Sequence, residues 1–261
     1  MESNARSNSL VTIILGVLFL GHWLAPPAVG EASVTKNLHV VDKAITFHGG
    51  PRFEQSETQL RMCSKSGCYE ITSRIEGGRF DLQVEGPVAG ARRRARITND
   101  RVEAWQGDTP MDLSQRESQS IRDWVMARVY FIFLPFRLND DSVWKEDLGS
   151  EMWDGRALRK VKVTFVPGSS SGADDEFLYW FEPDTGRLAQ FAYSFAGNPG
   201  GLRLRRAFNY RRVGGILFFD QENWGLDGPG LTVDDISPGG QTDWQRISTV
   251  TVEAIRVSAL E

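Results

Sequence analysis

The sequence predicts a mainly β fold of the α+β class, in which a curved antiparallel sheet of about 11 strands wraps around a central helix. A second helix is expected near the N-terminus. Short runs of alternating apolar and polar residues, separated by turn residues, predict the strands. One long run with apolar residues at three- and four-residue steps, Ser114–Leu138, predicts the central helix.

The run 114–138 opens with a capping box. Ser114 precedes Glu117 by three residues, a spacing in which each side chain satisfies a backbone N–H of the first turn. The apolar face widens toward Tyr130–Phe133, so the second half of the helix should be covered by protein on nearly all sides. Pro135 is expected to end the helix, because proline disfavours helical conformation in the residue before it.

A shorter amphipathic helix is predicted before the first strand. Residues on its apolar face recur at alternating four- and three-residue steps: Val34, Leu38, Val41, Ile45 and His48. Gly49-Gly50 supplies a C-terminal cap. His48, in the last turn, allows two interpretations. It contacts a ligand inside a cavity, or it caps the negative end of the helix dipole.

The strands lie on both sides of the central helix in the sequence. Glycine, asparagine and proline turns separate them, which indicates antiparallel hairpins: Gly77-Gly78, Asn99-Asp100, Pro183–Gly186 and Gly214-Gly215. There is no internal repeat and no linker that would separate two cores. Residues 31–261 are therefore predicted to form a single domain.

Residues 1–30 have the pattern of a secretory signal peptide. Arg6 precedes the apolar run Leu10–Leu20, and small residues follow at 28–32. An uncleaved anchor is the alternative, although the run is short for a spanning helix. Cleavage would remove Glu2 and Arg6 together and leave the net charge at −4. A negative net charge does not favour binding to nucleic acid, which is itself negatively charged. We expect an exported protein, periplasmic or extracellular, without a transmembrane span after cleavage.

Cys63 and Cys68 are the only cysteines. In an oxidising compartment, a close pair favours a disulfide, which here would join two strands of a hairpin and stabilise them by about 2 kcal/mol. A metal site and a redox pair are the alternatives. Two cysteines without neighbouring histidines make a poor zinc set. We therefore expect a structural disulfide and no metal.

Charged clusters give no convincing catalytic site. Arg92, Arg94 and Arg96 would share one face of a strand, either to bind an anionic partner such as a phospholipid headgroup or to form a solvated face. Acidic pairs such as Asp140-Asp141 and Asp234-Asp235 lie in polar loops, and no serine lies in a G-x-S-x-G elbow. We predict no catalytic residue and no cofactor, and the sequence offers no positive argument for an enzyme.

Several segments resemble known exported proteins. Phe177–Leu188 is similar to a recurring strand–turn–strand of the bacterial lipoprotein-localisation carriers (LolA/LolB-like), whose sheet is a half-barrel. Other segments resemble an uncharacterised family of exported bacterial proteins with that presumed fold: 43–50, Tyr130–Leu138, Lys160–Phe165 and Arg206–Val213. The resemblance covers most of the mature chain. The resemblance implies a half-barrel fold, and the shape of that fold implies the binding of acyl chains. It does not assign a ligand-binding or catalytic role to any individual residue of this sequence.

The expected function is binding of an apolar ligand, a lipid or an acyl chain, between the concave sheet and the central helix. Such sites are mostly apolar with a few polar anchors. The candidate ligand-binding residues are Trp124, Phe131, Phe133, Phe136, Tyr179, Phe181, Phe191, Tyr193 and His48. The alternative is a structural or protein-interaction module of the cell envelope with a solid core. Its partner would meet the loop Gly225–Gln241, which Trp224 and Trp244 flank.

Overall fold

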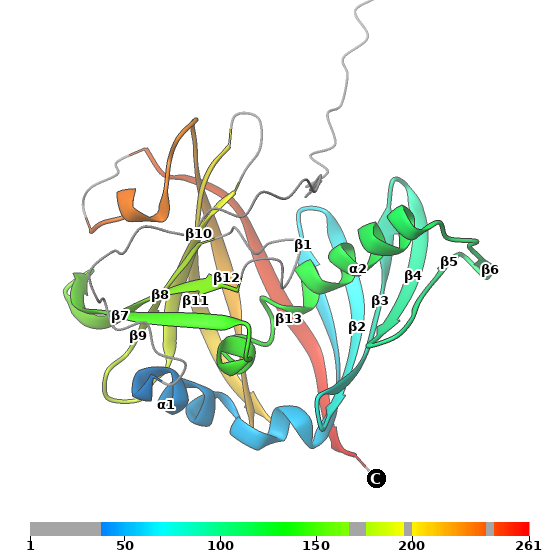
Figure 1. Cartoon of the computed structure of the whole chain (residues 1–261), viewed down its shortest axis with the longest axis horizontal. Helices are drawn as coiled ribbons and strands as arrows, with labels where there is room; N and C mark the ends of the chain where they lie inside the picture. The colour runs from blue at the N-terminus through cyan, green and yellow to red at the C-terminus, as the bar shows by residue number, and fades with distance from the viewer. Residues whose placement is uncertain (1–37, 167–175, 196–199, 239–242, 261) are drawn as a thin grey trace, which may run out of the picture.

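The computed structural model describes residues 38–166, 176–195, 200–238 and 243–260. The predicted signal peptide and the expected start of the first helix at Val34 lie outside these residues. The described part is one curved antiparallel sheet with helices packed against it (Figure 1). Its strands are β1 (Ser56–Ser64), β2 (Gly67–Glu76), β3 (Arg79–Val88), β4 (Ala91–Thr98), β5 (Val102–Gln106), β6 (Thr109–Pro110), β7 (Val143–Trp153), β8 (Arg156–Phe165), β9 (Phe177–Phe181), β10 (Leu188–Phe195), β11 (Gly201–Val213), β12 (Ile216–Asp227) and β13 (Gln245–Ala259).

The strand order is β6-β5-β4-β3-β2-β1-β13-β12-β11-β10-β9-β8-β7. The first strand, β1, therefore pairs with the last one, β13, at the centre of the sheet. Strands β1 to β6 form a meander from the centre to one edge, and strands β7 to β13 form a second meander from the other edge back to the centre. Between the two meanders, the chain has to cross from the β6 edge to the β7 edge. Helix α2 (Gln115–Val129) and the residues after it make this crossing on one face, which we call the concave face (Figure 1).

The 13 strands exceed the expected count of about 11. The two-residue strand β6 gave no alternating pattern. Strand β7 contains an irregularity between Asp147 and Gly149 that shifts its register against β8. A bulge of this kind reverses the alternation of faces, so the second half of β7 did not extend the pattern of the first.

Helix α2 begins as predicted and ends earlier. Ser114 accepts from the Glu117 N–H, and the Glu117 carboxylate accepts from the Ser114 N–H, which completes the capping box. The predicted continuation as far as Pro135 is wrong, because the helix ends at Val129. We call Tyr130–Asn139 the connecting segment; its last four residues form the short 3-10 helix η2 (Phe136–Asn139).

The connecting segment is irregular because its side chains are buried in two different hydrophobic clusters. Ile132 and Phe133 are buried with the strands under α2, whereas Leu134 and Leu138 are buried with β7–β10. A straight helix presents one stripe and cannot fill both clusters from consecutive residues. The apolar run predicted a helix that protein covers on all sides, but in the structure this run connects the first cluster to the second. Helix α2 packs on β3, β4 and β5 and so covers one half of the sheet, not its centre.

Three clusters form the interior. The first lies under α2 and includes Ile121 and Val125. The second lies under the connecting segment and α1 (His39–His48). The third covers the opposite, convex face, where 3-10 helix η3 (Val233–Asp235) and its loop pack on Leu178 and Trp180. None of the described helices is long and apolar enough to cross a membrane.

Helix α1 docks on the turn between β9 and β10. Gly186 in this turn has φ +80°, and a Cβ there would lie 2.9 Å from the backbone nitrogen of Ala44. The Lys43 ammonium donates to the Pro183 carbonyl at 2.8 Å. Glycine is needed at this position both for the left-handed backbone and for the close approach of the helix.

Candidate functional site

Four of the predicted ligand-binding residues belong to the solid interior. Tyr179, Phe181 and Phe191 are fully buried, and Phe133 is 5% exposed. The Tyr179 ring lies nearly parallel to those of Phe177, Phe181 and Phe191, with centroids 5.9–6.2 Å apart. These four stacked rings belong to the second cluster, whereas Phe133 belongs to the first.

Three neighbouring aromatic side chains on the concave face are only half-buried: Phe131, Phe165 and Tyr193. We call them the aromatic rim. Phe131 stacks on both Phe191 and Tyr193, with centroids 5.4 Å apart in each case. Phe177 joins Tyr193 to Phe165, at 5.3 and 5.8 Å. The rim is the accessible border of the buried aromatic stack.

Polar contacts hold the connecting segment against the sheet. The buried Gln221 amide donates to the Phe131 carbonyl at 2.8 Å, and the buried Lys145 ammonium donates to the Leu138 carbonyl at 2.7 Å. The Tyr130 and Tyr179 hydroxyls are 3.2 Å apart, and burial raises the pKa of Tyr130 to about 12. Burial lowers the pKa of Lys145. These contacts fix the backbone on both sides of Phe131.

The remaining predicted aromatics lie elsewhere. Trp124 is half-buried on α2, 6.1 Å from the Tyr69 ring, and Phe136 stacks on Phe53 with centroids 4.6 Å apart. Both pack against the first cluster. The structure therefore brings Phe131, Tyr179, Phe181, Phe191 and Tyr193 together and leaves Trp124, Phe133 and Phe136 in the other half.

His48 is fully buried and lies among backbone groups and aromatic rings. Its Nε2 accepts from the Leu188 N–H at 3.1 Å, and the Phe219 ring lies 5.9 Å away, edge-on. Burial and the nearby Arg212 lower the pKa of His48 to about 3. A cationic cap at the end of α1 is therefore excluded at neutral pH, because the imidazole is neutral and ties α1 to β10.

The other sequence-predicted sites have ordinary structural surroundings. Trp224 and Trp244 are half-buried against the third cluster, although part of the loop between them, 239–242, lies outside the described residues. Within the arginine run, Arg92 pairs with Glu85, Arg96 pairs with Asp81 at 2.6 Å, and Arg94 lies 4.6 Å from the Trp105 ring centroid. The run is thus a largely paired sheet face.

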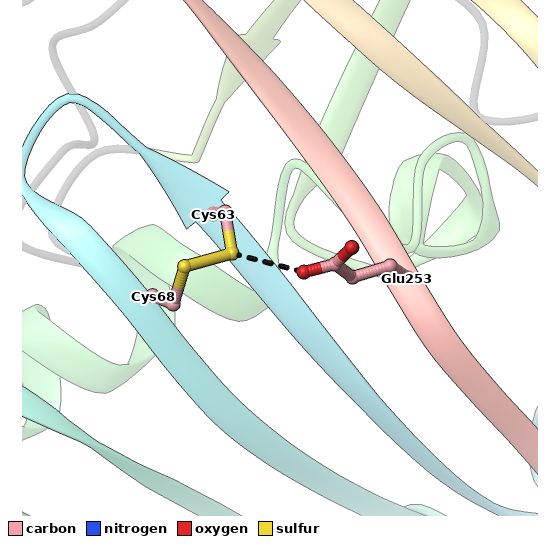
Figure 2. Close-up of side chains that lie close together, drawn as sticks. All are labelled: Cys63, Cys68 and Glu253. Atoms are coloured by element: carbon pink, nitrogen blue, oxygen red, sulfur yellow. Dashed lines mark hydrogen bonds between the residues drawn. A yellow bond between two sulfur atoms is a disulfide. The ribbon is translucent and has the colours of Figure 1, made fainter.

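Cys63 and Cys68 form the predicted disulfide between opposite residues of β1 and β2 (Figure 2). Glu253 of β13 lies beside it, with Oε1 3.3 Å from the Cys63 sulfur. Among the described residues, these three form a group compact enough to share a metal ion. Both sulfurs are bonded to each other and neither can act as a thiolate, so only the carboxylate remains as a ligand.

Two surface depressions lie outside the aromatic rim. One, of about 630 Å³, lies between β3 and β5 beside Arg79, Arg96 and Arg101. The other, of about 520 Å³, lies beside Asn209 and Asp220. Neither is lined by a predicted ligand-binding residue.

Arg205 is the residue that sequence reasoning missed. It lies half-buried on β11, opposite Phe191 of β10, and its guanidinium carbon is 5.0 Å from the Phe131 ring centroid. Its neighbours Arg203 and Arg206 have the same side-chain type, so the sequence contains no signal that separates the three. Only the strand register places Arg205 beside the aromatic rim.

Comparison with known proteins identifies a family. Residues 89–229, more than half of the 261 residues, match a family of unknown function, DUF6503. The chain belongs to this family. No curated protein matches this DUF6503 chain. The predicted relationship to an uncharacterised family therefore agrees with the match.

Solved structures similar to the DUF6503 chain have low sequence identity. A LolA superfamily protein from Nitrosomonas europaea is 12% identical, with a TM-score of 0.48 over 85% of this chain and 93% of that one. A lipoprotein-sorting protein domain from Vibrio parahaemolyticus is 11% identical, with a TM-score of 0.49 over 88% and 95%. A DUF1329 family protein from Desulfovibrio piger is 12% identical, with a TM-score of 0.48 over 83% and 91%. The predicted resemblance to the lipoprotein-localisation carriers is thus found among solved structures.

Proposed function

We propose that this DUF6503 chain is an exported binding protein for an apolar ligand, a lipid or an acyl chain, held at the aromatic rim of the concave face. The observation that carries the proposal is the half-buried ladder of Phe131, Tyr193 and Phe165, which continues the buried aromatic stack to the surface. Half-exposed aromatic rings gain free energy when an apolar chain covers them.

The ligand would lie beside the connecting segment, since Phe131 belongs to that segment and not to α2. The Phe131 ring rests on Phe191 and Tyr193, and an acyl chain would lie across the accessible parts of the Phe131 and Tyr193 rings. The backbone can stay in place, because the Gln221 amide holds the Phe131 carbonyl. The pattern of residues 1–30 and the Cys63–Cys68 disulfide support export, because disulfides persist in oxidising compartments.

Native mass spectrometry of the protein from an exporting host, followed by organic extraction, tests this proposal. We expect a bound acyl species on the wild-type chain and about tenfold less on Phe131→Ser, since an apolar contact is lost. Phe208→Ser is the control, because Phe208 is 38% exposed on β11 and lies outside the rim. An unloaded wild-type mass, unchanged after incubation with vesicles of membrane lipids, would contradict the proposal.

A second candidate function, protein interaction, rests on the edge strand β7. This eleven-residue strand pairs only with β8 in the described part of the chain, and it exposes Trp144 (39%), Leu148 (40%) and Met152 (56%). An unpaired edge with apolar side chains can accept a strand from a partner. This edge, not the Trp224–Trp244 loop, is where the structure favours a contact.

Site-specific photocrosslinking tests the second candidate. A crosslinking residue at Leu148 should capture one defined envelope protein, whereas the same residue at Thr109 on the opposite edge strand β6 should capture none. Introduction of lysine at Met152 should reduce the yield at position 148 several-fold, because charge on an edge strand opposes pairing. Equal capture from both edges would rule out a specific contact at β7.

A further inference from the structure

Within the described parts of the chain, Arg205 has no acidic neighbour on the concave face. The register places Phe191 and Asn223 opposite it on the two adjacent strands. Along β11, the residues on the same face are Arg203 and Ala207. The guanidinium therefore lies on a half-buried aromatic and amide surface, where an unpaired charge is unfavourable.

The hydrogen bonds of Arg205 are few and go to neutral groups. Nη1 donates to the Gln221 side-chain oxygen and Nη2 to the Tyr193 hydroxyl, each at 3.3 Å. Its buried Nε has no acceptor among the described residues. Donors of a guanidinium match the two oxygens of a carboxylate in a planar fork, and here most of them have no partner.

Three other arginines of β11 have a carboxylate within 3.3 Å: Arg203 with Asp227, Arg206 with Asp154, and Arg211 with Asp220. The fourth, Arg212, is exposed and donates to the carbonyls of Phe47 and Gly215, so Arg205 is the half-buried arginine of this strand that has no acidic partner among the described residues. A partner was therefore available to arginines on both sides of the strand. At position 205, no carboxylate among the described residues pairs with the arginine that lies beside the aromatic rim.

Arg128 is another half-buried arginine of the concave side for which no carboxylate partner is found among the described residues. Its surroundings account for this. Its guanidinium lies between the Tyr69 and Trp124 rings, at 4.5 and 4.4 Å, and donates to the Trp124 carbonyl at 2.8 Å. It caps the C-terminal turn of α2, where a cation is stabilised by the helix dipole. Arg205 has no such role.

We propose that Arg205 binds the carboxylate of a fatty acid whose alkyl chain covers the aromatic rim. The inference rests on the proposed function and names its ligand class. The carboxylate would accept from the guanidinium, with the Tyr193 hydroxyl as a second donor, and the chain would extend over Phe131. A single-chain carboxylate fits because one cation and one short ladder of rings supply one charge and one apolar track.

Binding of dodecanoate and dodecan-1-ol to delipidated protein, followed by native mass spectrometry and tryptophan fluorescence, tests the assignment. The two probes share one alkyl chain and differ in charge. The wild-type chain should bind dodecanoate about tenfold more tightly than the alcohol, and Arg205→Gln should bind both within about twofold. Arg203→Gln should keep the wild-type preference, because Arg203 is already paired with Asp227.

Each outcome separates the two proposals. Equal binding of both probes to the wild-type chain, or a preference that survives in Arg205→Gln, would overturn the role of Arg205 and leave the apolar site intact. Binding of neither probe would overturn the proposed function as well. If Arg205→Gln fails to fold, Arg205→Lys replaces it. It should keep the preference at a reduced level, since it keeps the charge and loses the planar fork.

Discussion

Acidification from pH 7 to pH 4.5 should destabilise the fold by about 2 to 3 kcal/mol through His48 alone. Burial, followed by the positive charges of Arg212 and Arg187, lowers the pKa of His48 from 6.5 to about 3. Protonation would also convert Nε2 from an acceptor into a donor that faces the Leu188 N–H. In the unfolded chain, the imidazole takes up a proton near pH 6.5, so the stabilisation is complete above that value and is lost as the pH falls toward 3.

Urea unfolding at several pH values measures this effect. His48→Gln should be nearly insensitive to pH between 7 and 4.5, because its amide can accept from Leu188 but does not titrate. His39→Gln should keep the wild-type slope, since His39 is exposed. A wild-type slope in His48→Gln would show that another group is responsible.

Measurements that stop at pH 4.5 avoid interference from Glu151. Burial acts to raise the pKa of this carboxyl, but hydrogen bonds from Trp153, Trp180 and Lys160 outweigh burial and lower it. A carboxyl whose pKa is lowered in the folded state stabilises the fold at pH values above its unfolded-state pKa, which is near 4.3. This contribution is lost only as the pH falls below that value. Between pH 7 and 4.5, Glu151 therefore contributes little to the slope.

Replacement of Asp220 by alanine should reduce the free energy of unfolding by about 3 to 5 kcal/mol. The carboxylate is 4% exposed and accepts from the Asn209 amide at 2.7 Å, the Arg211 guanidinium at 2.8 Å and the Val252 N–H at 2.9 Å. Two of these partners lie at or near residues with a left-handed backbone. Asn209 itself has φ of 50°, and Ala254, two residues after Val252, also has φ of 50°. Alanine would leave the half-buried Arg211 cation without a carboxylate and the buried Val252 N–H without an acceptor.

Denaturant titration of three variants checks the role of Asp220. Asp227→Ala removes an exposed partner of Arg203 and should cost less than about 1 kcal/mol. Asp220→Asn keeps an acceptor but removes the charge, so its loss should lie between those of the other two variants. If Asp220→Ala costs no more than Asp227→Ala, the buried carboxylate does not hold these strands together.

Local signals in the sequence predicted features correctly where a few neighbouring residues determine the structure. The capping box at Ser114, the glycine cap after His48 and the Cys63–Cys68 pair are all present. Each depends on residues close together in the chain. The same reasoning failed at the connecting segment, because an apolar run does not reveal that Phe133 and Leu134 are buried in different clusters.

The candidate site was predictable in its composition but not in its exposure. Aromatic residues of the connecting segment and of β9 and β10 do meet, as Phe131 and Phe191 show. Which rings remain accessible depends on how closely distant strands pack, and no local pattern encodes that. Arg205 could not be singled out for a related reason, since a missing carboxylate becomes visible only when β10, β11 and β12 are in register.

The central pairing of β1 with β13 has a consequence for how the chain is made. Ribosomes deliver β1 early and β13 last, so the inner edge of the first meander stays open until residues 245–259 emerge. An open edge can pair with another chain, and contacts between distant residues form slowly. Completion of this sheet therefore waits for residues 245–259, and a product truncated before them would expose β1 as a template for aggregation.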